Sequence, residues 1–125
     1  MTSVSSSPAL PFSDAIDSNG TVYISGQIGL DPDTKSLPPG GFEAEARQVM
    51  QNLGAVLRKY ELGYSDLVNV TIYLKTMENY AVLNAVYRTF FGEIFPARVC
   101  IAVFDLPLNA NVEIAGIAQR KALAR

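Results

Sequence analysis

The 125-residue sequence contains no histidine and only one cysteine, Cys100. A single cysteine cannot form an internal disulfide, and without histidine or a second thiol there is no recognisable Cys/His zinc framework. The chain also lacks the histidine that a Cys–His nucleophile would use as its base. These absences fit a reducing compartment and predict no bound metal.

Charged residues are few as well, at 18% of the chain, and they sum to a net charge of −2. This balance gives no broad cationic surface, although it is compatible with a small local basic patch. A protein that holds nucleic acid mainly through phosphates is therefore disfavoured.

Long hydrophobic runs are also missing. No stretch reaches transmembrane length, and the first residues have neither a basic start nor a sustained apolar run. We therefore expect no membrane span and no secretory signal, with a cytoplasmic location as the default. Residues 1–11, which contain several serines and two prolines, are expected to form a flexible arm.

Apolar residues are abundant, at 49% of the chain, which suffices for one compact domain over residues 1–125. Their spacing predicts the order β-β-α-β-α-β-β, an α+β fold in which two helices cover one face of a mixed sheet. The predicted elements are a hairpin within 12–30 that turns at 17–20, a helix over 42–60 ended by Gly63, a strand over 68–75, a helix N-capped by Thr76, and two final strands.

The two final strands carry the residues of chemical interest. The first, Arg98 to Phe104, alternates so that Arg98 and Cys100 share one face, and in the second Glu113 points away from the aliphatic side. If the two strands pair with their aliphatic positions on the same side, a cation, a thiol and a carboxylate share one surface.

The sheet face without helices is expected to be apolar. It would expose the side chains of Cys100, Ala102, Phe104, Ala115 and Ile117. A soluble monomer seldom exposes so large an apolar surface, so we expect a homo-oligomer that buries it. Arg98 and Glu113 would then lie near a subunit boundary, where clefts for small ligands commonly form.

Several segments together resemble the RidA/YjgF family of reactive-intermediate deaminases. They are Pro96-Ala97-Arg98-Val99-Cys100, the Leu106-Pro107 connection, Val112-Glu113-Ile114, Ser25-Gly26-Gln27 and Asn84-Ala85-Val86-Tyr87. The resemblance covers about residues 12–120. It implies a chorismate-mutase-like fold, a homotrimer with ligand sites between subunits, and hydrolysis of 2-imino acids to 2-keto acids and ammonia without metal or cofactor. The 2-imino acids arise from enamines that pyridoxal-phosphate dehydratases release.

The chemistry of the residues is compatible with that activity. The Arg98 guanidinium can bind a carboxylate through two hydrogen bonds and so orient the neighbouring electrophilic carbon. Glu113 can take a proton from the attacking water and help the amine to leave. The resemblance further places Gly26, Cys100 and Asn84 at the pocket, with Cys100 as a lining residue.

Each residue taken alone also has an ordinary structural role. Arg98 could be a salt-bridged strand residue, Glu113 an outward-facing one, Cys100 a small buried hydrophobe, Asn84 a helix-surface amide, and Gly26 a simple β-bulge. Only their coincidence argues for a site.

One departure from the family pattern concerns the N-terminal segment. The family commonly has Gly-Pro-Tyr with its tyrosine at the pocket, whereas this chain has Leu10-Pro11-Phe12, so Phe12 keeps the ring without the hydroxyl. The departure leaves room for a non-catalytic protein that binds small carboxylates. A ribonuclease or translation inhibitor, another activity of relatives, ranks last because the chain lacks a histidine base and a cationic surface.

Overall fold

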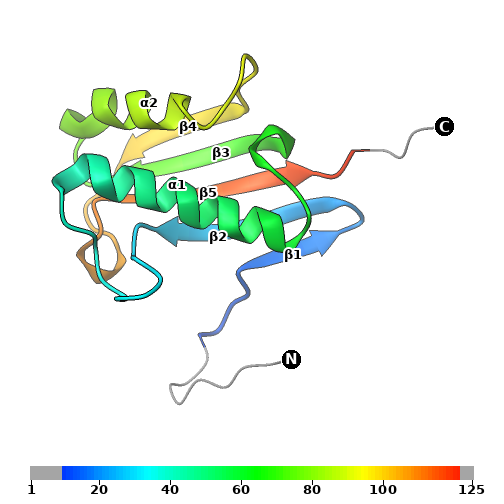
Figure 1. Cartoon of the computed structure of the whole chain (residues 1–125), viewed down its shortest axis with the longest axis horizontal. Coiled ribbons are helices and arrows are strands. Elements are labelled where there is room, and N and C mark those ends of the chain that lie inside the picture. The colour runs from blue at the N-terminus through cyan, green and yellow to red at the C-terminus, as the bar shows by residue number, and fades with distance from the viewer. Residues whose placement is uncertain (1–9, 122–125) are drawn as a thin grey trace.

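The computed structural model describes residues 10–121, and its helices and strands follow the predicted order (Figure 1). The elements are β1 (Ala15–Ser18), β2 (Thr21–Ile28), α1 (Gly41–Lys59), β3 (Leu67–Leu74), α2 (Tyr80–Arg88), β4 (Ala97–Ala102) and β5 (Val112–Gln119). Strand β4 ends before the predicted Phe104. Most of the arm predicted over residues 1–11 lies outside the described residues.

The β1–β2 hairpin turns where the Asn-Gly pair predicts. Asn19 and Gly20 have φ angles of 55° and 89°, the left-handed pair that a two-residue hairpin turn requires. The backbone N–H of Gly20 donates to Oδ1 of Asp17 at 2.9 Å, which closes the turn.

The five strands form one mixed sheet in the order β1-β2-β5-β3-β4. Strands β3 and β4 run parallel because α2 connects them in a crossover, and the remaining neighbours are antiparallel. The expected pairing of the last two strands is therefore wrong. Strand β5 lies between β2 and β3, so β3 separates it from β4.

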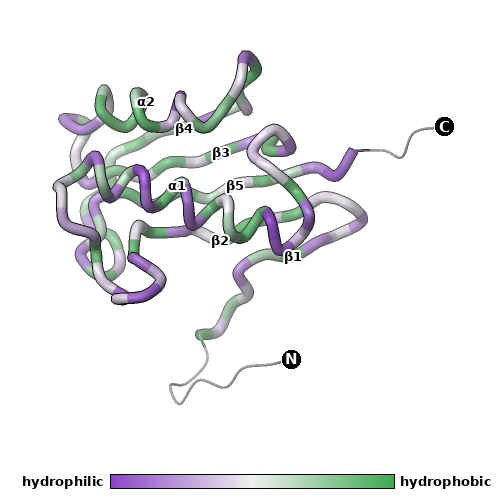
Figure 2. The backbone as a smooth tube through the Cα atoms, in the orientation of Figure 1, coloured by the Kyte–Doolittle hydropathy of each residue, from purple (hydrophilic) through white to green (hydrophobic). Residues whose placement is uncertain are grey.

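Both helices lie on one face of the sheet, as predicted (Figure 1). Apolar and polar residues alternate along α1 in Figure 2, and its apolar side packs on the sheet through Met50, Leu53 and Leu57. Alternate residues of the strands, such as Ile72 and Ile114, complete this core. Neither helix is long and apolar enough to cross a membrane, for the residues described.

Two helix boundaries differ from the sequence predictions. Helix α1 ends at Lys59, and Glu61 rather than Gly63 takes the left-handed conformation, with a φ of 60°. The Oγ1 atom of Thr76 accepts a hydrogen bond from the backbone N–H of Glu78, as expected of a cap. It caps a 3₁₀ turn, Met77–Asn79, that leads directly into α2.

Glu45 is the one charged residue buried in the described chain, at 3% exposure. Its Oε2 accepts from the backbone N–H of Asn111 at 2.7 Å, and its Oε1 accepts from the Asn111 side chain at 2.8 Å. The backbone carbonyl of Asn111 in turn accepts from the N–H of Lys75. Helix α1 therefore fixes Asn111, the residue just before β5.

We expect Glu45→Gln to lower the free energy of unfolding by about 1–3 kcal/mol, because the new amide N–H₂ would face an N–H donor in a buried site. Urea denaturation measures this loss. The control is Glu43→Gln, two residues away in the same helix but exposed and paired only with Arg47 at the surface. It should cost less than about 1 kcal/mol. Equal losses in both variants would contradict the structural role of Glu45.

Candidate functional site

The sheet face opposite the helices is exposed and apolar, as predicted, but some of its residues are not the predicted ones. Ala115 and Ile117 lie on it together with Tyr23, which pairs with Ile117. Cys100 and Ala102 pair with the buried Ile72 and Leu74, so they lie on the helix side instead. Phe104 lies beyond β4 and is 98% exposed. Large side chains nevertheless cover the open face, with Ile16, Val99 and Ile101 between 45% and 55% exposed.

On the helix side, Arg98 of β4 lies against two tyrosines of α2. Its guanidinium carbon is 4.9 Å from the ring centre of Tyr87 and 5.7 Å from that of Tyr80. Its Nη2 donates to the Tyr80 hydroxyl at 3.2 Å. Within residues 10–121 no carboxylate forms an ion pair with Arg98. The guanidinium is therefore held in place with donors left for a ligand.

A hollow of about 230 Å³ lies beside this guanidinium. Its lining residues come from α2 and from the segment that leads into β4, and they are Asn84, Tyr87, Arg88, Phe95, Pro96 and Arg98. The structure thus places Arg98 and Asn84 at the same hollow. The position of Cys100, two residues further along β4 and on the same face, is consistent with a place near this group.

Burial keeps the neighbouring ionisable groups protonated. It raises the pKa of Tyr87 to about 12, against the opposing charge of Arg98, and the Tyr87 hydroxyl has no hydrogen-bond partner in the described structure. Burial also raises the pKa of the Cys100 thiol, although the positive charge of Arg98 acts to lower it. A thiol that stays protonated is a poor nucleophile, which agrees with a lining role for Cys100.

The second group of predicted residues lies around Glu113 of β5. Strand β2 has a bulge between Ile24 and Gln27, and the Glu113 carboxylate lies against the backbone of Gly26 within that bulge. A Cβ atom on Gly26 would come within 2.8 Å of Glu113 Cδ. Burial raises the pKa of Glu113. The missing side chain of Gly26 thus makes room for a partly desolvated carboxyl group.

For the imine hydrolysis that the family resemblance implies, we expect Gly26→Ala to lower kcat/KM by about 10-fold or more, because the added Cβ atom would displace the Glu113 carboxylate. Stability should change little, since the Glu113 side chain can rotate away. Activity and thermal unfolding measured side by side separate the two effects.

The control for this variant is Gly63→Ala. Gly63 has an ordinary φ of −131°, and a Cβ atom there would meet nothing within 4 Å. Unchanged activity in Gly26→Ala would show that the position of the Glu113 carboxylate does not matter.

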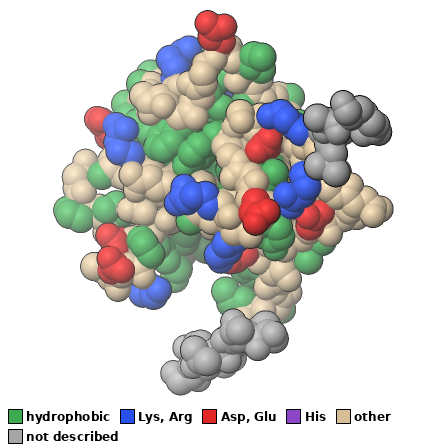
Figure 3. All heavy atoms as spheres, turned by 45° about the vertical axis from the view of Figure 1, so that its right-hand side comes forward, with side chains coloured by type: hydrophobic (Ala, Val, Ile, Leu, Met, Phe, Trp, Pro, Cys, Tyr) green, Lys and Arg blue, Asp and Glu red, His purple; other side chains and the backbone are tan. Residues whose placement is uncertain are grey.

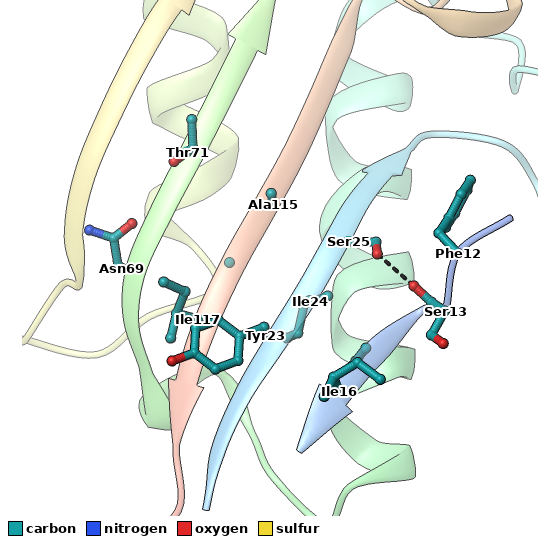
Figure 4. A pocket seen from close by; sticks show the side chains of 12 residues that line it. Phe12, Ser13, Ile16, Tyr23, Ile24, Ser25, Asn69, Thr71, Ala115 and Ile117 are labelled. Atoms are coloured by element: carbon teal, nitrogen blue, oxygen red, sulfur yellow. Dashed lines mark hydrogen bonds between the residues drawn. The ribbon is translucent and has the colours of Figure 1, made fainter. Parts of the chain in front are cut away.

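Phe12 lies on the open face, at a larger hollow of about 460 Å³ (Figure 4). Tyr23, Ser25, Thr71 and Ile117 also line it. The Ser25 hydroxyl donates to the backbone carbonyl of Ser13 at 2.6 Å and so ties the segment that carries Phe12 to β2. Ser25 precedes Gly26, so this hollow adjoins the Glu113 group.

The predicted single surface with Arg98, Cys100 and Glu113 is therefore wrong within one chain. Arg98 pairs with Val70 on the helix side of the sheet, whereas Glu113 pairs with Tyr73 on the open side. Strand β3 also stands between the two strands. One chain presents two separate half-sites, one around Arg98 and the other around Glu113.

Three residues near Arg98 were not predicted to lie beside it. Tyr80 and Tyr87 have the helical spacing that is typical of core residues, and no motif marks Arg88. The signal was present: positions 80, 84, 87 and 88 recur at helical spacing, so Asn84 shares its face of α2 with all three.

Other features of the surface bear on metals and nucleic acid. Residues 10–121 contain no cluster of three or more potential metal ligands. On the face shown in Figure 3, basic and acidic side chains are interspersed without a large patch of one sign.

Comparison with known proteins identifies the family. A family model described as Endoribonuclease L-PSP matches residues 2–120. The mouse protein named 2-iminobutanoate/2-iminopropanoate deaminase is 40% identical over 108 residues, 86% of this chain and 80% of the relative.

Solved structures agree with the sequence matches. RidA from the Antarctic bacterium Psychrobacter sp. PAMC 21119 matches with a TM-score of 0.85 and 36% identity over 90% of this chain and 91% of that one. E. coli TdcF, solved with bound serine, matches with a TM-score of 0.85 and 29% identity over 91% of each chain. The expected chorismate-mutase-like α+β fold is thus confirmed, and the chain belongs to the RidA/YjgF family.

Proposed function

We propose that this protein is an imine deaminase that hydrolyses 2-imino acids, such as 2-iminobutyrate or 2-iminopropionate, to 2-keto acids and ammonia. The observation that carries the proposal is Arg98, a guanidinium with no carboxylate partner in the described chain, held against Tyr87 at the wall of a hollow. The name of the mouse relative supports the same reaction, and the serine bound to TdcF supports a small carboxylate ligand.

A complete site requires a second copy of the chain. Arg98 and Glu113 lie on opposite faces of one sheet. In the proposed assembly, the Arg98 half-site of one copy therefore meets the Glu113 half-site of its neighbour. The exposed apolar residues of the open face supply a surface for that contact. We propose a homotrimer with three such sites, the assembly that the family resemblance implies.

The reaction then follows from the two half-sites. Arg98 binds the substrate carboxylate through its guanidinium fork and orients the imine carbon. Glu113 of the neighbouring copy takes a proton from water as the water oxygen bonds to the carbon of the protonated imine, which gives a neutral carbinolamine. The same carboxyl passes this proton to the amine nitrogen, and its carboxylate then takes the hydroxyl proton as the C–N bond breaks, which forms the keto acid. The released ammonia carries that last proton away as ammonium, and Glu113 returns to its carboxylate form.

The raised pKa of Glu113 suits this double role. A desolvated carboxylate is a stronger base than one in water, and its conjugate acid is present in a larger fraction near neutral pH. Asn84, whose amide can donate and accept, lies beside Arg98 to contact the substrate. Cys100 and Gly26 serve as lining and spacing residues.

A coupled assay tests the proposal. Threonine dehydratase generates the short-lived imine, and keto-acid formation is followed with and without this protein. Acceleration beyond spontaneous hydrolysis is expected. No acceleration by a folded, oligomeric sample would overturn the proposed reaction.

A second candidate function is carboxylate binding without turnover. Phe12 is 61% exposed at the open-face hollow near Glu113, and its ring offers no hydroxyl there. Phe12 therefore favours this second function. Saturable binding of a keto acid without acceleration in the coupled assay would identify this function. The word endoribonuclease in the family description does not favour RNA cleavage here, because the chain has no histidine and a net charge of −2.

A further inference from the structure

The hollow beside Arg98 contains a second arginine without a carboxylate partner. Five basic residues within 10–121 form ion pairs, namely Arg47, Lys59, Lys75, Arg120 and Lys121. Arg88 and Arg98 do not, and both line this one hollow. The other lining residues are Asn84, Tyr87, Phe95 and Pro96, so the lining carries two positive charges and no negative charge.

Each guanidinium is placed by an aromatic ring. Arg98 lies 4.9 Å from the ring centre of Tyr87, and Arg88 lies 5.6 Å from that of Phe95. The two rings are nearly parallel, with an interplanar angle of 17° and centres 6.5 Å apart. An arginine that packs its face on a ring keeps the N–H donors at its edge for an anion. The paired rings therefore hold two cationic donor groups at one hollow.

Arg98 and Arg88 differ in position. Arg98 is half-buried on β4, whereas Arg88 is exposed in the last turn of α2. In the proposed reaction Arg98 binds the carboxylate next to the imine carbon. Arg88 then remains at the rim, where the far end of the substrate side chain would lie.

We propose that this hollow favours 2-imino and 2-keto acids that carry a second carboxylate, which Arg88 binds while Arg98 binds the first. This inference rests on the proposed function and adds a substrate class to it. A substrate with an uncharged side chain leaves Arg88 in contact with water, which costs little free energy. Monocarboxylates therefore also bind, but less tightly than dicarboxylates. The preference should weaken with salt because Arg88 is exposed.

The test compares two keto acids of the same chain length, 2-oxoglutarate and 2-oxopentanoate, which differ by the terminal carboxylate. Titration calorimetry at low salt should show 2-oxoglutarate binding about 2–5-fold more tightly, the worth of one ion pair at an exposed site. Arg88→Gln should abolish this preference and leave 2-oxopentanoate affinity within about twofold of the original.

The matched control is Arg58→Gln. Arg58 is an exposed arginine at the end of α1 that does not line the hollow, and its loss changes the net charge equally. This variant should keep the preference. A preference that survives Arg88→Gln, or that Arg58→Gln also abolishes, would overturn the inference. A fall in the oligomer mass of Arg88→Gln would also overturn the inference, because it would mean that Arg88 contacts a neighbouring copy.

Failure of the inference can be told from failure of the proposed function. Equal affinity for both keto acids, with imine hydrolysis intact, overturns the dicarboxylate preference alone. Absence of imine hydrolysis overturns the proposed reaction, whichever acid binds. Binding of neither acid overturns the inference, and the coupled assay then decides on the reaction.

Discussion

Arg98→Ala is expected to lower kcat/KM for imine hydrolysis by about 10²–10³-fold, since a bidentate contact both binds the substrate and orients its reacting carbon. No other described guanidinium makes contact with two tyrosine rings at a hollow. The coupled dehydratase assay measures the loss. Activity equal to that of the unaltered protein would remove Arg98 from the site and with it the main support for the reaction.

Arg98→Lys distinguishes charge from geometry. Lysine keeps the positive charge but loses the planar fork that matches a carboxylate and lies on the Tyr87 ring. We expect an intermediate loss of about 10–100-fold, on the basis that orientation matters as well as charge. Arg58→Ala, which removes an arginine that does not line the hollow, should leave activity unchanged and so serves as the control.

The parts of the fold that depend on local sequence were predictable. The Asn19-Gly20 turn follows from the tolerance of these residues for positive φ, and the regular alternation in β3 follows from burial of one face. The element order and the placement of both helices on one face follow from the same periodicity. Among these local features, only boundaries such as the end of α1 differ from the prediction. There Glu61, rather than the predicted Gly63, takes the left-handed conformation.

The neighbours within the sheet were not predicted correctly, and this error affected the site. The sequence suggested that β4 and β5 pair because they are consecutive, but consecutive strands need not be adjacent. A β3-α2-β4 crossover makes β4 a parallel neighbour of β3, and the 3₁₀ turn at 107–109 then lets the chain return to the other edge of β3. The predicted order contained this crossover, but it leaves one edge of β4 free and so does not decide whether β5 pairs with β4 or with β3.

This correction changes how the candidate site is understood. A shared surface would have joined Arg98 and Glu113 within one chain, whereas they lie on opposite faces of the sheet, and for this reason the proposed site combines Arg98 of one copy with Glu113 of another. The aromatic support of Arg98 was also missed, since Tyr80 and Tyr87 have the pattern of core residues. Only the tertiary contact of α2 with β4 reveals that their rings hold a guanidinium.

Glu113→Gln is expected to lower kcat by about 10²–10⁴-fold, the usual range for loss of a general acid–base group. In the unaltered protein, the rate should rise with pH as Glu113 loses its proton. Because burial raises its pKa, the midpoint of this acid limb should lie above the ordinary glutamate range. The limb should be absent from the residual activity of the variant. An unchanged pH profile would assign the proton transfer to another group.

Stability separates this effect from damage to the fold. A carboxyl whose pKa is raised on folding binds more protons in the folded state, so its contribution to stability falls as pH rises through the interval between the two pKa values. At neutral pH, above the ordinary glutamate range, Glu113→Gln should therefore be at least as stable as the unaltered protein. Thermal unfolding checks this, and a marked loss would point to a structural role.

Mixing the two inactive variants tests whether the half-sites come from different copies. Arg98→Ala keeps Glu113, and Glu113→Gln keeps Arg98, so an oligomer containing both can rebuild intact sites where the two kinds of subunit meet. With equal co-expression and random assembly into rings, about a quarter of the sites should be intact, because each of the two contributing subunits is correct half of the time. Recovery of activity in the purified mixed oligomer would not occur if both residues served the same site from one chain, since every site would then lack one of them.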